Sequence, residues 1–444
     1  MKAKPLQMFD FAMIASVLIL GTLSVIFIYS SAFDSSGTMQ DKLKTDYIKQ
    51  IIWASGGLLS MIVLALLDYR KFKRYIPWLA AVTVVLLAIT LKFGRISHGA
   101  RSWLSFGPIN LQPAEFAKIS FTLFLAWYLD KYRKHSDLKR FAIALLILAI
   151  PVGLILKQPD FGSAMVYIPI FIIVCFMADI PLRYLFIILL TGGLAVVLAV
   201  LPVWQEKIYK QPFFLVSILG NKRLFMIVVA ATLMVALIGA LGLLLFKKRY
   251  FYWIAYAFGI IFASLLLSVV ARKFLQEYQV MRLIIFLDPY VEAKKSGWNI
   301  INSRIAIGSG QFTGKGFLLG THSHYRYLPE QSTDFIFSIL AEELGFIGCM
   351  IVFIAYFMIL IRIVFVARNT TDYFGCLICT GFLAMFFFHF MVNVGMTMGI
   401  MPITGIPLPF VSYGGSAFVT NSIALGLVMS VRSRRLDFSA TGYI

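Results

Sequence analysis

Long uncharged apolar runs constrain this chain more than any other feature. An α-helix needs about 20 apolar residues to cross a hydrocarbon core about 30 Å thick. Inside that core every backbone polar group must be paired within the protein, so only helices and closed barrels can span it. The composition agrees, with 60% hydrophobic and 14% charged residues, against about 25% charged residues in a soluble domain. We therefore predict an all-α polytopic membrane protein.

The apolar runs predict about twelve transmembrane helices. We place them at 10–33, 51–67, 75–91, 116–129, 141–156, 161–178, 184–203, 224–246, 251–271, 335–361, 373–396 and 410–431. The fourth to sixth runs are short for a bilayer, so we expect their ends to rest on polar protein surface.

The distribution of Lys and Arg predicts the orientation. With a cytoplasmic N-terminus, 20 of the 40 basic residues fall in seven short inner segments, which are 1–9, 68–74, 130–140, 179–183, 247–250, 362–372 and 432–444. Short cytoplasmic loops carry such an excess of cations. We therefore expect both termini to be cytoplasmic. The net charge of +20 then reflects topology and contact with anionic membrane lipid, and we expect no nucleic acid partner.

Two predicted outer loops stand out by length and composition. Residues 92–115 and 272–334 are polar and rich in Gly and Pro, whereas the inner loops are short. Long loops are usually functional or disordered. These two contain Trp103, Trp298 and several tyrosines, which disordered linkers lack. We therefore expect the functional site to lie on the outer side of the membrane.

A charged pair follows the first outer loop. Gln112-Pro113-Ala114-Glu115 is typical of a helix start, where an acidic residue is stabilised by the helix dipole. Lys118 lies three residues further on the same helix face, inside an apolar span. Ionisable residues within a membrane span indicate a functional site. The alternative is a salt bridge that only holds the bundle together.

Asp160 lies in the very short outer turn Lys157-Gln158-Pro159-Asp160. Its position before Phe161 is typical of a helix N-cap. At the mouth of a cavity it would also supply a carboxylate to a binding site, and both interpretations stay open.

The large loop contains the spacing G-x-x-x-G-K-G at residues 310–316. This spacing is one residue short of a Walker A motif and has Gly where Ser or Thr binds magnesium, so a nucleotide site is excluded. Backbone amides beside Lys315 could still hold a lipid pyrophosphate. His322 and His324 lack further ligands nearby and are expected to be solvent-exposed rather than metal-bound.

Three acidic residues mark the start of the span at 335–361. Asp334 is either a helix N-cap, with Ser332 and Thr333 beside it, or a carboxylate that accepts a proton at the outer surface. Glu342 and Glu343 follow two turns later, where apolar surroundings argue against ordinary surface charges.

Taken together, these segments resemble a known family. Residues 107–118, 158–164, 305–337 and 407–415 are similar to the SEDS family of cell-wall polymerases, which includes RodA, FtsW and SpoVE. The run at 305–337 resembles the RodA branch most. The resemblance covers roughly residues 94–435. It implies a peptidoglycan glycosyltransferase of the bacterial inner membrane that polymerises lipid II during cell elongation and shape maintenance, with its active site facing the periplasm or cell exterior.

The resemblance also assigns roles and partners. Its catalytic Thr-Asp-Phe motif falls on Asp334, its buried Glu and Lys fall on Glu115 and Lys118, and its Gln-Pro-Asp motif falls on Asp160. It implies a class B penicillin-binding protein and the elongation machinery as partners. It also suggests a divalent cation, Mg or Mn, with unknown ligands. The family usually has ten spans, so we expect one inserted hairpin at about 204–250 and a catalytic outer loop at 272–334 before the tenth span.

The expected reaction joins two lipid-linked disaccharides. A carboxylate deprotonates the acceptor sugar hydroxyl while a lipid pyrophosphate leaves the donor's anomeric carbon, with inversion. Cations stabilise the departing pyrophosphate. The candidate cations for this role are Arg101, Lys118, Lys315 and Arg326. A lipid II transporter and a non-catalytic scaffold for a transpeptidase are the alternatives.

Overall fold

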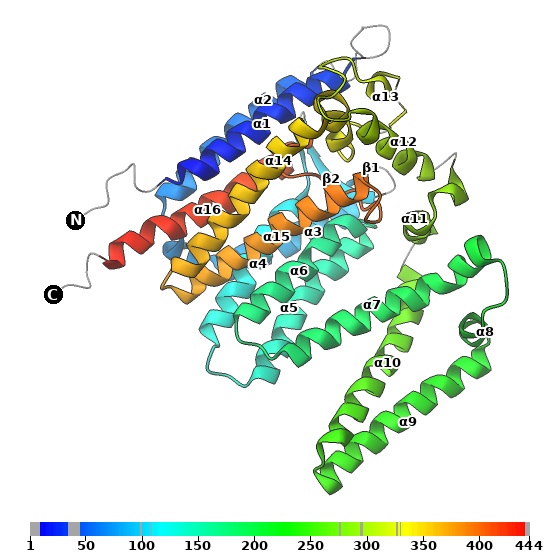
Figure 1. The fold of residues 1–444 in the computed structure, drawn as a ribbon. Coiled ribbons are helices and arrows are strands. Elements are labelled where there is room, and N and C mark those ends of the chain that lie inside the picture. Colours follow the sequence, from blue (N-terminus) through cyan, green and yellow to red (C-terminus); the bar gives the residue numbers. More distant parts are fainter. Residues whose placement is uncertain are drawn as a thin grey trace. The chain divides into compact units, whose positions relative to one another are not determined.

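Helices make up most of the protein in the computed structural model (Figure 1). The structure describes residues 9–33, 45–97, 100–107, 109–274, 277–293, 296–325, 327–328 and 330–439. These residues divide into two compact units, one made of 1–180 and 298–444 and the other of 181–297.

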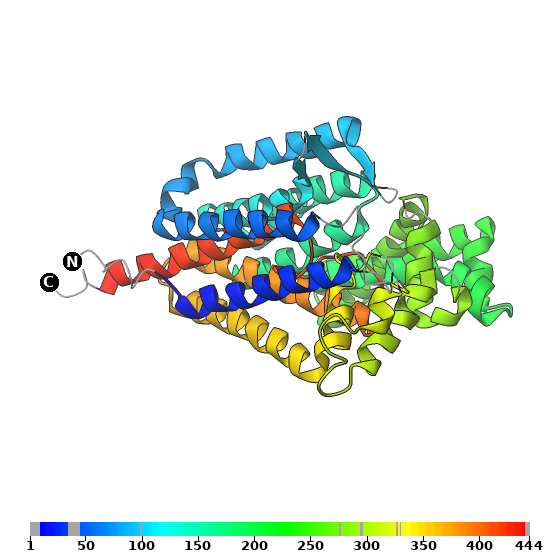
Figure 2. The same ribbon diagram turned by 90° about the horizontal axis from the view of Figure 1, so that it is seen from above.

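The first unit is a helical bundle that contains a small sheet and two short helical turns. Its main helices are α1 (Phe11–Ser31), α2 (Asp46–Leu66), α3 (Ile76–Phe93), α4 (Pro113–Lys131), α5 (Asp137–Lys157), α6 (Phe161–Met177), α12 (Ser296–Ser309), α14 (Ile336–Asn369), α15 (Tyr373–Thr397) and α16 (Gly415–Ser439). The short turns are η2 (Tyr69–Arg74) and α13 (Thr321–His324). Helices far apart in sequence lie side by side, with α16 along α2 and α14 along α1, and α14 also packs against the next helix, α15 (Figures 1 and 2).

The second unit consists of α7 (Leu182–Trp204), η3 (Gln205–Tyr209), α8 (Phe214–Gly220), α9 (Lys222–Phe246), α10 (Arg249–Phe274), α11 (Glu277–Leu287) and η4 (Pro289–Glu292). Helix α10 packs against both α7 and α9. The close approach of α9 to α10 uses Gly239 and Gly242, where a Cβ atom would meet Ala255 and Phe251.

Each of the twelve predicted runs lies on a helix. Among the described residues, nine helices are long and apolar enough to cross a membrane, and α6 is a shorter apolar helix of 17 residues. The chain is therefore a multi-pass helical membrane protein. The last helix begins at Gly415 rather than near residue 410, because the residues before it form a loop that is hydrogen-bonded to Gln50 and Thr333.

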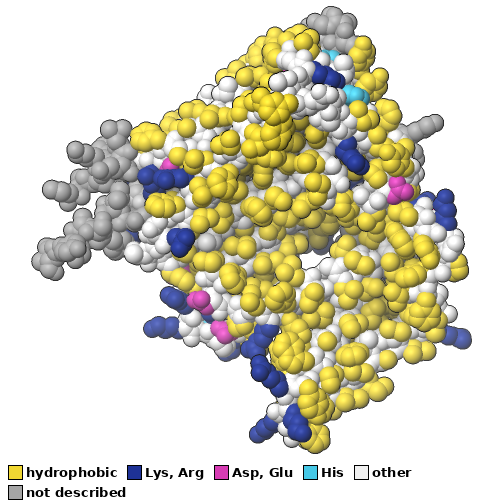
Figure 3. Space-filling model, in the orientation of Figure 1, with side chains coloured by type: hydrophobic (Ala, Val, Ile, Leu, Met, Phe, Trp, Pro, Cys, Tyr) yellow, Lys and Arg dark blue, Asp and Glu magenta, His cyan; other side chains and the backbone are white. Residues whose placement is uncertain are grey.

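The surface of the helices fits a lipid environment. Large apolar side chains such as Trp78, Leu245 and Phe357 are exposed. Figure 3 shows hydrophobic side chains spread over the visible face, with Lys and Arg gathered toward its margins. In water such a continuous apolar surface would drive aggregation, whereas in a bilayer it is matched by the acyl chains.

The first outer loop contains a small sheet that the prediction of an all-α protein missed. Strands β1 (Arg95–Ser97), β2 (Ala100–Phe106) and β3 (Ile109–Leu111) form an antiparallel sheet in the order β1-β2-β3. Its register pairs Ile96 with Arg101 and Ser105 with Asn110. The sheet leads directly into α4, so it fixes where the charged residues of that helix begin.

Polar side chains tie the helices together at the predicted inner ends. Asp10 caps α1 by accepting from the Met13 amide and also pairs with Arg362 of α14, whose Nη2 lies 2.6 Å from its Oδ2. Tyr69 donates to Asp372, the N-cap of α15, at 2.6 Å. Burial, followed by this hydrogen bond, raises the pKa of the Tyr69 phenol, so it stays protonated and acts as the donor.

Candidate functional site

Helix α4 places Glu115 and Lys118 inside the bundle. Pro113 in its first turn starts the helix, and the i, i+3 spacing brings the two side chains together. Lys118 Nζ lies 2.8 Å from Glu115 Oε1, and the side chains are 1% and 3% exposed. Glu115 Oε2 makes no hydrogen bond with the residues that the structure describes. The predicted pair therefore exists, and it is buried.

Helix α15 supplies two polar side chains on the same side, one turn apart. His389 Nε2 lies 3.1 Å from Lys118 Nζ, and His389 Nδ1 lies 3.1 Å from the carbonyl oxygen of Pro407. Asn393 Nδ2 donates to the carbonyl oxygens of Ile406 (2.8 Å) and Asp334 (3.2 Å). We call Glu115, Lys118, His389 and Asn393 the α4–α15 polar core. It connects the charged pair to the backbone of the segment that carries Asp334.

Asp334 lies in the turn before α14 and is half-buried. The residue at the N-cap position of α14 is Phe335, so of the two interpretations of Asp334 the structure does not place it at the cap position itself. The backbone N–H of Asp334 donates to the Glu330 carbonyl oxygen at 3.2 Å, so the residue belongs to the turn that precedes the helix. Asp334 still lies just before the N-terminus of α14, where the helix dipole favours a negative charge.

The loop before α16 fixes the position of this turn. Ser412 Oγ donates to the Thr333 carbonyl oxygen at 2.5 Å, and the Tyr413 amide donates to Ser332 at 2.8 Å. Tyr413 Oη lies 3.3 Å from Asp46 Oδ1 at the start of α2. Together with Asn393, these bonds hold the backbone on both sides of Asp334.

Asp160 is an N-cap, as one of its two interpretations predicts. Its carboxylate accepts from the Ser163 amide (3.0 Å) and Ser163 Oγ (2.9 Å), and Gln112 Nε2 donates to it at 3.1 Å. Because Gln112 directly precedes α4, the contact joins the starts of α4 and α6. A substrate-binding role for Asp160 stays a prediction.

The glycine segment, residues 308–316, docks onto a break in α14. Gly345 has φ 64° and ψ −155°, which interrupts the helix. The amides of Lys315 and Gly316 donate to the carbonyl oxygens of Glu342 and Glu343, and the amide of Phe346 donates to Gln311. The amides beside Lys315 that were considered for a pyrophosphate are therefore bonded within the protein.

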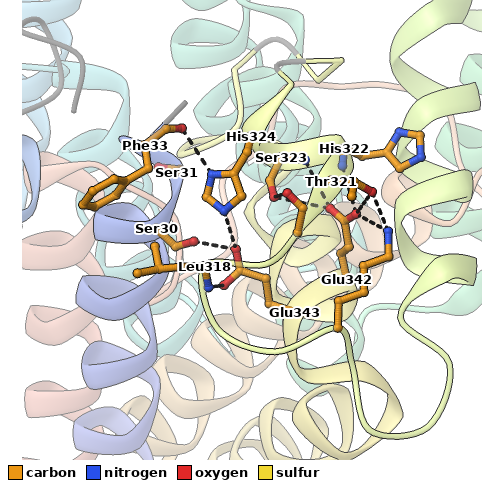
Figure 4. Close-up of polar contacts among 12 residues, drawn as sticks. Ser30, Ser31, Phe33, Leu318, Thr321, His322, Ser323, His324, Glu342 and Glu343 are labelled. Atoms are coloured by element: carbon orange, nitrogen blue, oxygen red, sulfur yellow. Dashed lines mark hydrogen bonds and ion pairs between the residues drawn. The ribbon is translucent and has the colours of Figure 1, made fainter. Parts of the chain in front are cut away.

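Glu342 and Glu343 hold residues 315–324 of the large loop (Figure 4), and both are fully buried. Glu342 accepts from Lys315 Nζ (2.8 Å) and the amides of His322 (2.9 Å) and Ser323 (3.1 Å). Glu343 accepts from the Leu318 amide at 3.1 Å and from Ser30 Oγ. These contacts agree with the argument that neither residue is an ordinary surface charge.

The histidines of the loop differ from expectation. His322 is half-buried, and His324 is buried rather than exposed. His324 Nδ1 lies 3.3 Å from the Phe33 carbonyl oxygen and its Nε2 lies 3.7 Å from Glu343 (Figure 4). The sequence did not indicate this burial because it depends on Phe33, which lies 291 residues earlier, just after α1.

The described candidate cations all contact protein groups. Arg101 Nη1 lies 3.4 Å from the carbonyl oxygens of Leu91 and Lys92 at the end of α3. Lys118 is buried against Glu115 and His389, and Lys315 is bonded to Glu342. Arg326 lies outside the described residues. Of the described cations, Lys315 is partly accessible, with 27% of its side chain exposed.

A preformed metal site is not found among the described residues. No three His, Cys, Asp or Glu side chains in that part of the chain converge into a set that could hold an ion. The carboxylates of Glu342 and Asp160 instead accept hydrogen bonds from amide, hydroxyl and ammonium groups.

The family follows from comparison with known proteins. The profile of the FtsW/RodA/SpoVE family, described as cell cycle protein, matches residues 10–213 and 215–436. The chain belongs to this family. The relatives and solved structures compared below match this chain over nearly its whole length.

Two relatives illustrate the similarity. The chain is 43% identical to peptidoglycan glycosyltransferase RodA of Treponema pallidum, over 98% of this chain and 100% of that protein. It is 32% identical to peptidoglycan glycosyltransferase MrdB of Escherichia coli K12, over 96% and 94% of the two chains.

Solved structures show the same fold. A chain from a peptidoglycan synthase complex that coordinates polymerization and crosslinking has a TM-score of 0.65 and 25% identity, covering 96% of this chain and 98% of that one. The rod shape determining protein RodA of Thermus thermophilus has a TM-score of 0.58 and 23% identity, covering 96% and 97%.

Proposed function

We propose that this protein is a peptidoglycan glycosyltransferase that polymerises lipid II during cell elongation and shape maintenance. The observation that carries the proposal is the position of Asp334. It is half-buried, it lies just before α14, and the backbone beside it is held by Asn393 and Ser412. The similarity to RodA of Treponema pallidum over the whole chain supports the same activity.

In the proposed reaction the Asp334 carboxylate acts as general base. It accepts the proton of an acceptor sugar hydroxyl, whose oxygen then attacks the anomeric carbon of the donor. The bond from that carbon to the lipid pyrophosphate breaks, and the pyrophosphate leaves with the electron pair. A single carboxylate acting on the sugars corresponds to inversion at the anomeric carbon.

Two further parts of the proposal concern the leaving group. Lys315 and Arg101 are the described candidate cations with partly exposed side chains, and we propose that Lys315 turns toward the pyrophosphate. A divalent cation, Mg²⁺ or Mn²⁺, is expected to support the reaction from solution. This expectation is tested by measuring lipid II polymerisation before and after divalent ions are removed with a chelator, and again after each ion is added back. Unchanged strand synthesis in the presence of the chelator would contradict it.

We further propose that the protein lies in the bacterial inner membrane with Asp334 on the outer side. A class B penicillin-binding protein and the elongation machinery are the proposed partners. The relation to a synthase complex that coordinates polymerization and crosslinking supports a crosslinking partner.

The test is lipid II polymerisation by purified Asp334→Asn protein. Asparagine keeps the shape of the side chain but cannot accept the proton, so turnover should fall by about 10²–10⁴. Asp372→Asn is the matched control, because Asp372 also precedes a helix and accepts from the Gly375 amide, at the other end of the bundle. It should lower thermal stability and leave turnover per folded molecule unchanged.

Near-normal strand synthesis by Asp334→Asn would contradict the assignment and direct attention to Glu115 or Asp160. The same assay on the wild-type protein separates the alternatives. Movement of lipid II without strand formation would indicate a transporter, and neither activity would indicate a scaffold.

A further inference from the structure

His389 is a buried imidazole with a polar partner on each ring nitrogen. It is 0% exposed in the middle of α15. Nδ1 lies 3.1 Å from the Pro407 carbonyl oxygen, which can only accept a hydrogen bond, so we assign the proton to Nδ1. Nε2 then carries a lone pair, and it faces the Lys118 ammonium at 3.1 Å. His389 is therefore arranged as a neutral ring that donates to one side and accepts from the other.

The position of Lys118 depends on this ring. Its ammonium contacts Glu115 Oε1 at 2.8 Å and His389 Nε2, within a site that is closed to water. A buried ammonium that loses an acceptor is strongly destabilised in that position, because no solvent replaces the lost bond. Without the imidazole, Lys118 would shift or draw in water, and the orientation of Glu115 would change with it.

The same helix face also holds the backbone next to Asp334. Asn393, one turn after His389, donates to the carbonyl oxygens of Asp334 and Ile406. His389 donates to Pro407, the residue that follows Ile406. Two adjacent carbonyls of the 406–407 segment are thus bound by two side chains of α15. A displacement at His389 passes to Asp334 through this segment and through Asn393.

From these contacts we infer that His389 is a positioning residue for the polymerisation reaction. It acts through Lys118 and through the 406–407 segment, and it does not touch the substrate. The inference rests on the proposed function, in which Asp334 must be held against the acceptor hydroxyl. The inference predicts that turnover, rather than substrate affinity, depends on the two hydrogen bonds of the His389 ring. A displacement of the catalytic carboxylate by about 1 Å can lower the rate on the order of 10²-fold.

The central test compares His389→Leu with His389→Gln in lipid II polymerisation by the full-length protein. Leucine removes both hydrogen bonds, so kcat per folded molecule should fall by about 10–100-fold with little change in KM. Glutamine can accept with Oε1 and donate with Nε2, so it should restore most of kcat. Wild-type kcat in the Leu variant, or equal loss in both variants, would overturn the inference.

A matched control separates positioning from stability. Tyr356→Phe removes a buried hydrogen bond to the carbonyl oxygen of Pro409 in the same loop but does not touch Lys118. It should lower the melting temperature and leave kcat per folded molecule unchanged. A loss of kcat in Tyr356→Phe as large as that in His389→Leu would mean that any loosening of the loop suffices, and the specific role of His389 would be lost.

A double-mutant cycle tests the route through Lys118. Lys118→Met and His389→Leu should be non-additive in kcat, because each breaks the same contact. Additive effects would contradict the inference. If His389→Leu does not fold, His389→Asn takes its place in the cycle, since its shorter side chain cannot reach both partners. Inactive wild-type protein or active Asp334→Asn would count against the proposed function, whereas His389 variants with normal kcat count against this inference alone.

Discussion

At the scale of single residues, the ionisable side chains inside the first unit are bonded mainly to protein groups. Lys118 contacts Glu115 and His389, and Lys315 contacts Glu342. Their charges are compensated before any substrate binds, which limits the cost of burying them. A pyrophosphate that recruits Lys315 must therefore compete with Glu342, and this exchange would link substrate binding to the conformation of the large loop.

Glu342→Gln tests how strongly this carboxylate holds the loop. Glutamine removes the ion pair with Lys315 and places an amide beside the N–H groups of His322 and Ser323. Removing one partner of a buried charged network should destabilise the fold by about 3 kcal/mol. Lys315→Met should cost less, since the Lys315 side chain is partly exposed and Glu342 keeps its amide donors. Thermal unfolding and the rate of proteolysis within residues 310–324 measure the effect of each variant. A larger destabilisation by Lys315→Met than by Glu342→Gln would contradict this account.

At the scale of elements, the break in α14 explains why glycines recur in the large loop. A Cβ atom at Gly310 would lie 1.9 Å from the Ala341 carbonyl oxygen, and one at Gly345 would lie 2.3 Å from the Gly314 nitrogen. The segment can pair with the open turn of the helix only if both backbones lack side chains there. Its resemblance to a phosphate loop thus has a structural cause, which is close contact between two backbones.

Gly345→Ala should disrupt this docking. The residue adopts φ 64° and ψ −155°, a conformation essentially restricted to glycine, so the strain should reach at least about 2 kcal/mol before the clash is counted. Gly308→Ala is the matched control, because a Cβ atom there meets nothing within 4 Å. It lies inside α12 and should be neutral or slightly stabilising. Equal melting temperatures for the two variants would contradict the proposed docking.

The same region shows what sequence could and could not predict. The helices follow from apolar runs, the Glu115–Lys118 pair from its i, i+3 spacing, and the cap at Asp160 from its place before Phe161. The break at Gly345 could not be predicted, because it is defined by pairing with residues 30 positions earlier. His389 could have been found as an ionisable residue within an apolar span. Its partner Lys118, 271 residues away, could not.

At the scale of the whole molecule, the orientation in the membrane can be tested with introduced cysteines. Tyr325→Cys lies in the large loop and Lys134→Cys in a predicted inner segment, and both side chains are exposed. In intact cells an impermeant thiol reagent should label the first and not the second. Labelling of Tyr325→Cys only after membrane permeabilisation would place Asp334 on the cytoplasmic side and exclude the proposed reaction.

The division into two units predicts that the inserted hairpin is dispensable for chemistry. The polar core, Asp160 and Asp334 belong to the first unit. The hairpin of α9 and α10, which overlaps the predicted insertion at 204–250, lies within the second. Helix α9 is exposed along most of its length, and its buried residues include Gly239 and Gly242, which face α10.

Deleting α9 and α10 together, residues 222–274, removes two predicted crossings and so preserves the orientation of everything that follows. The shortened protein should keep measurable lipid II polymerisation, because the polar core and the segment around Asp334 are untouched. Its stability will fall, since α7 loses its contacts with α10. Activity is therefore compared per folded molecule, with Asp334→Asn in the shortened chain as the background. A folded deletion with no activity above that background would show that the second unit takes part in the reaction.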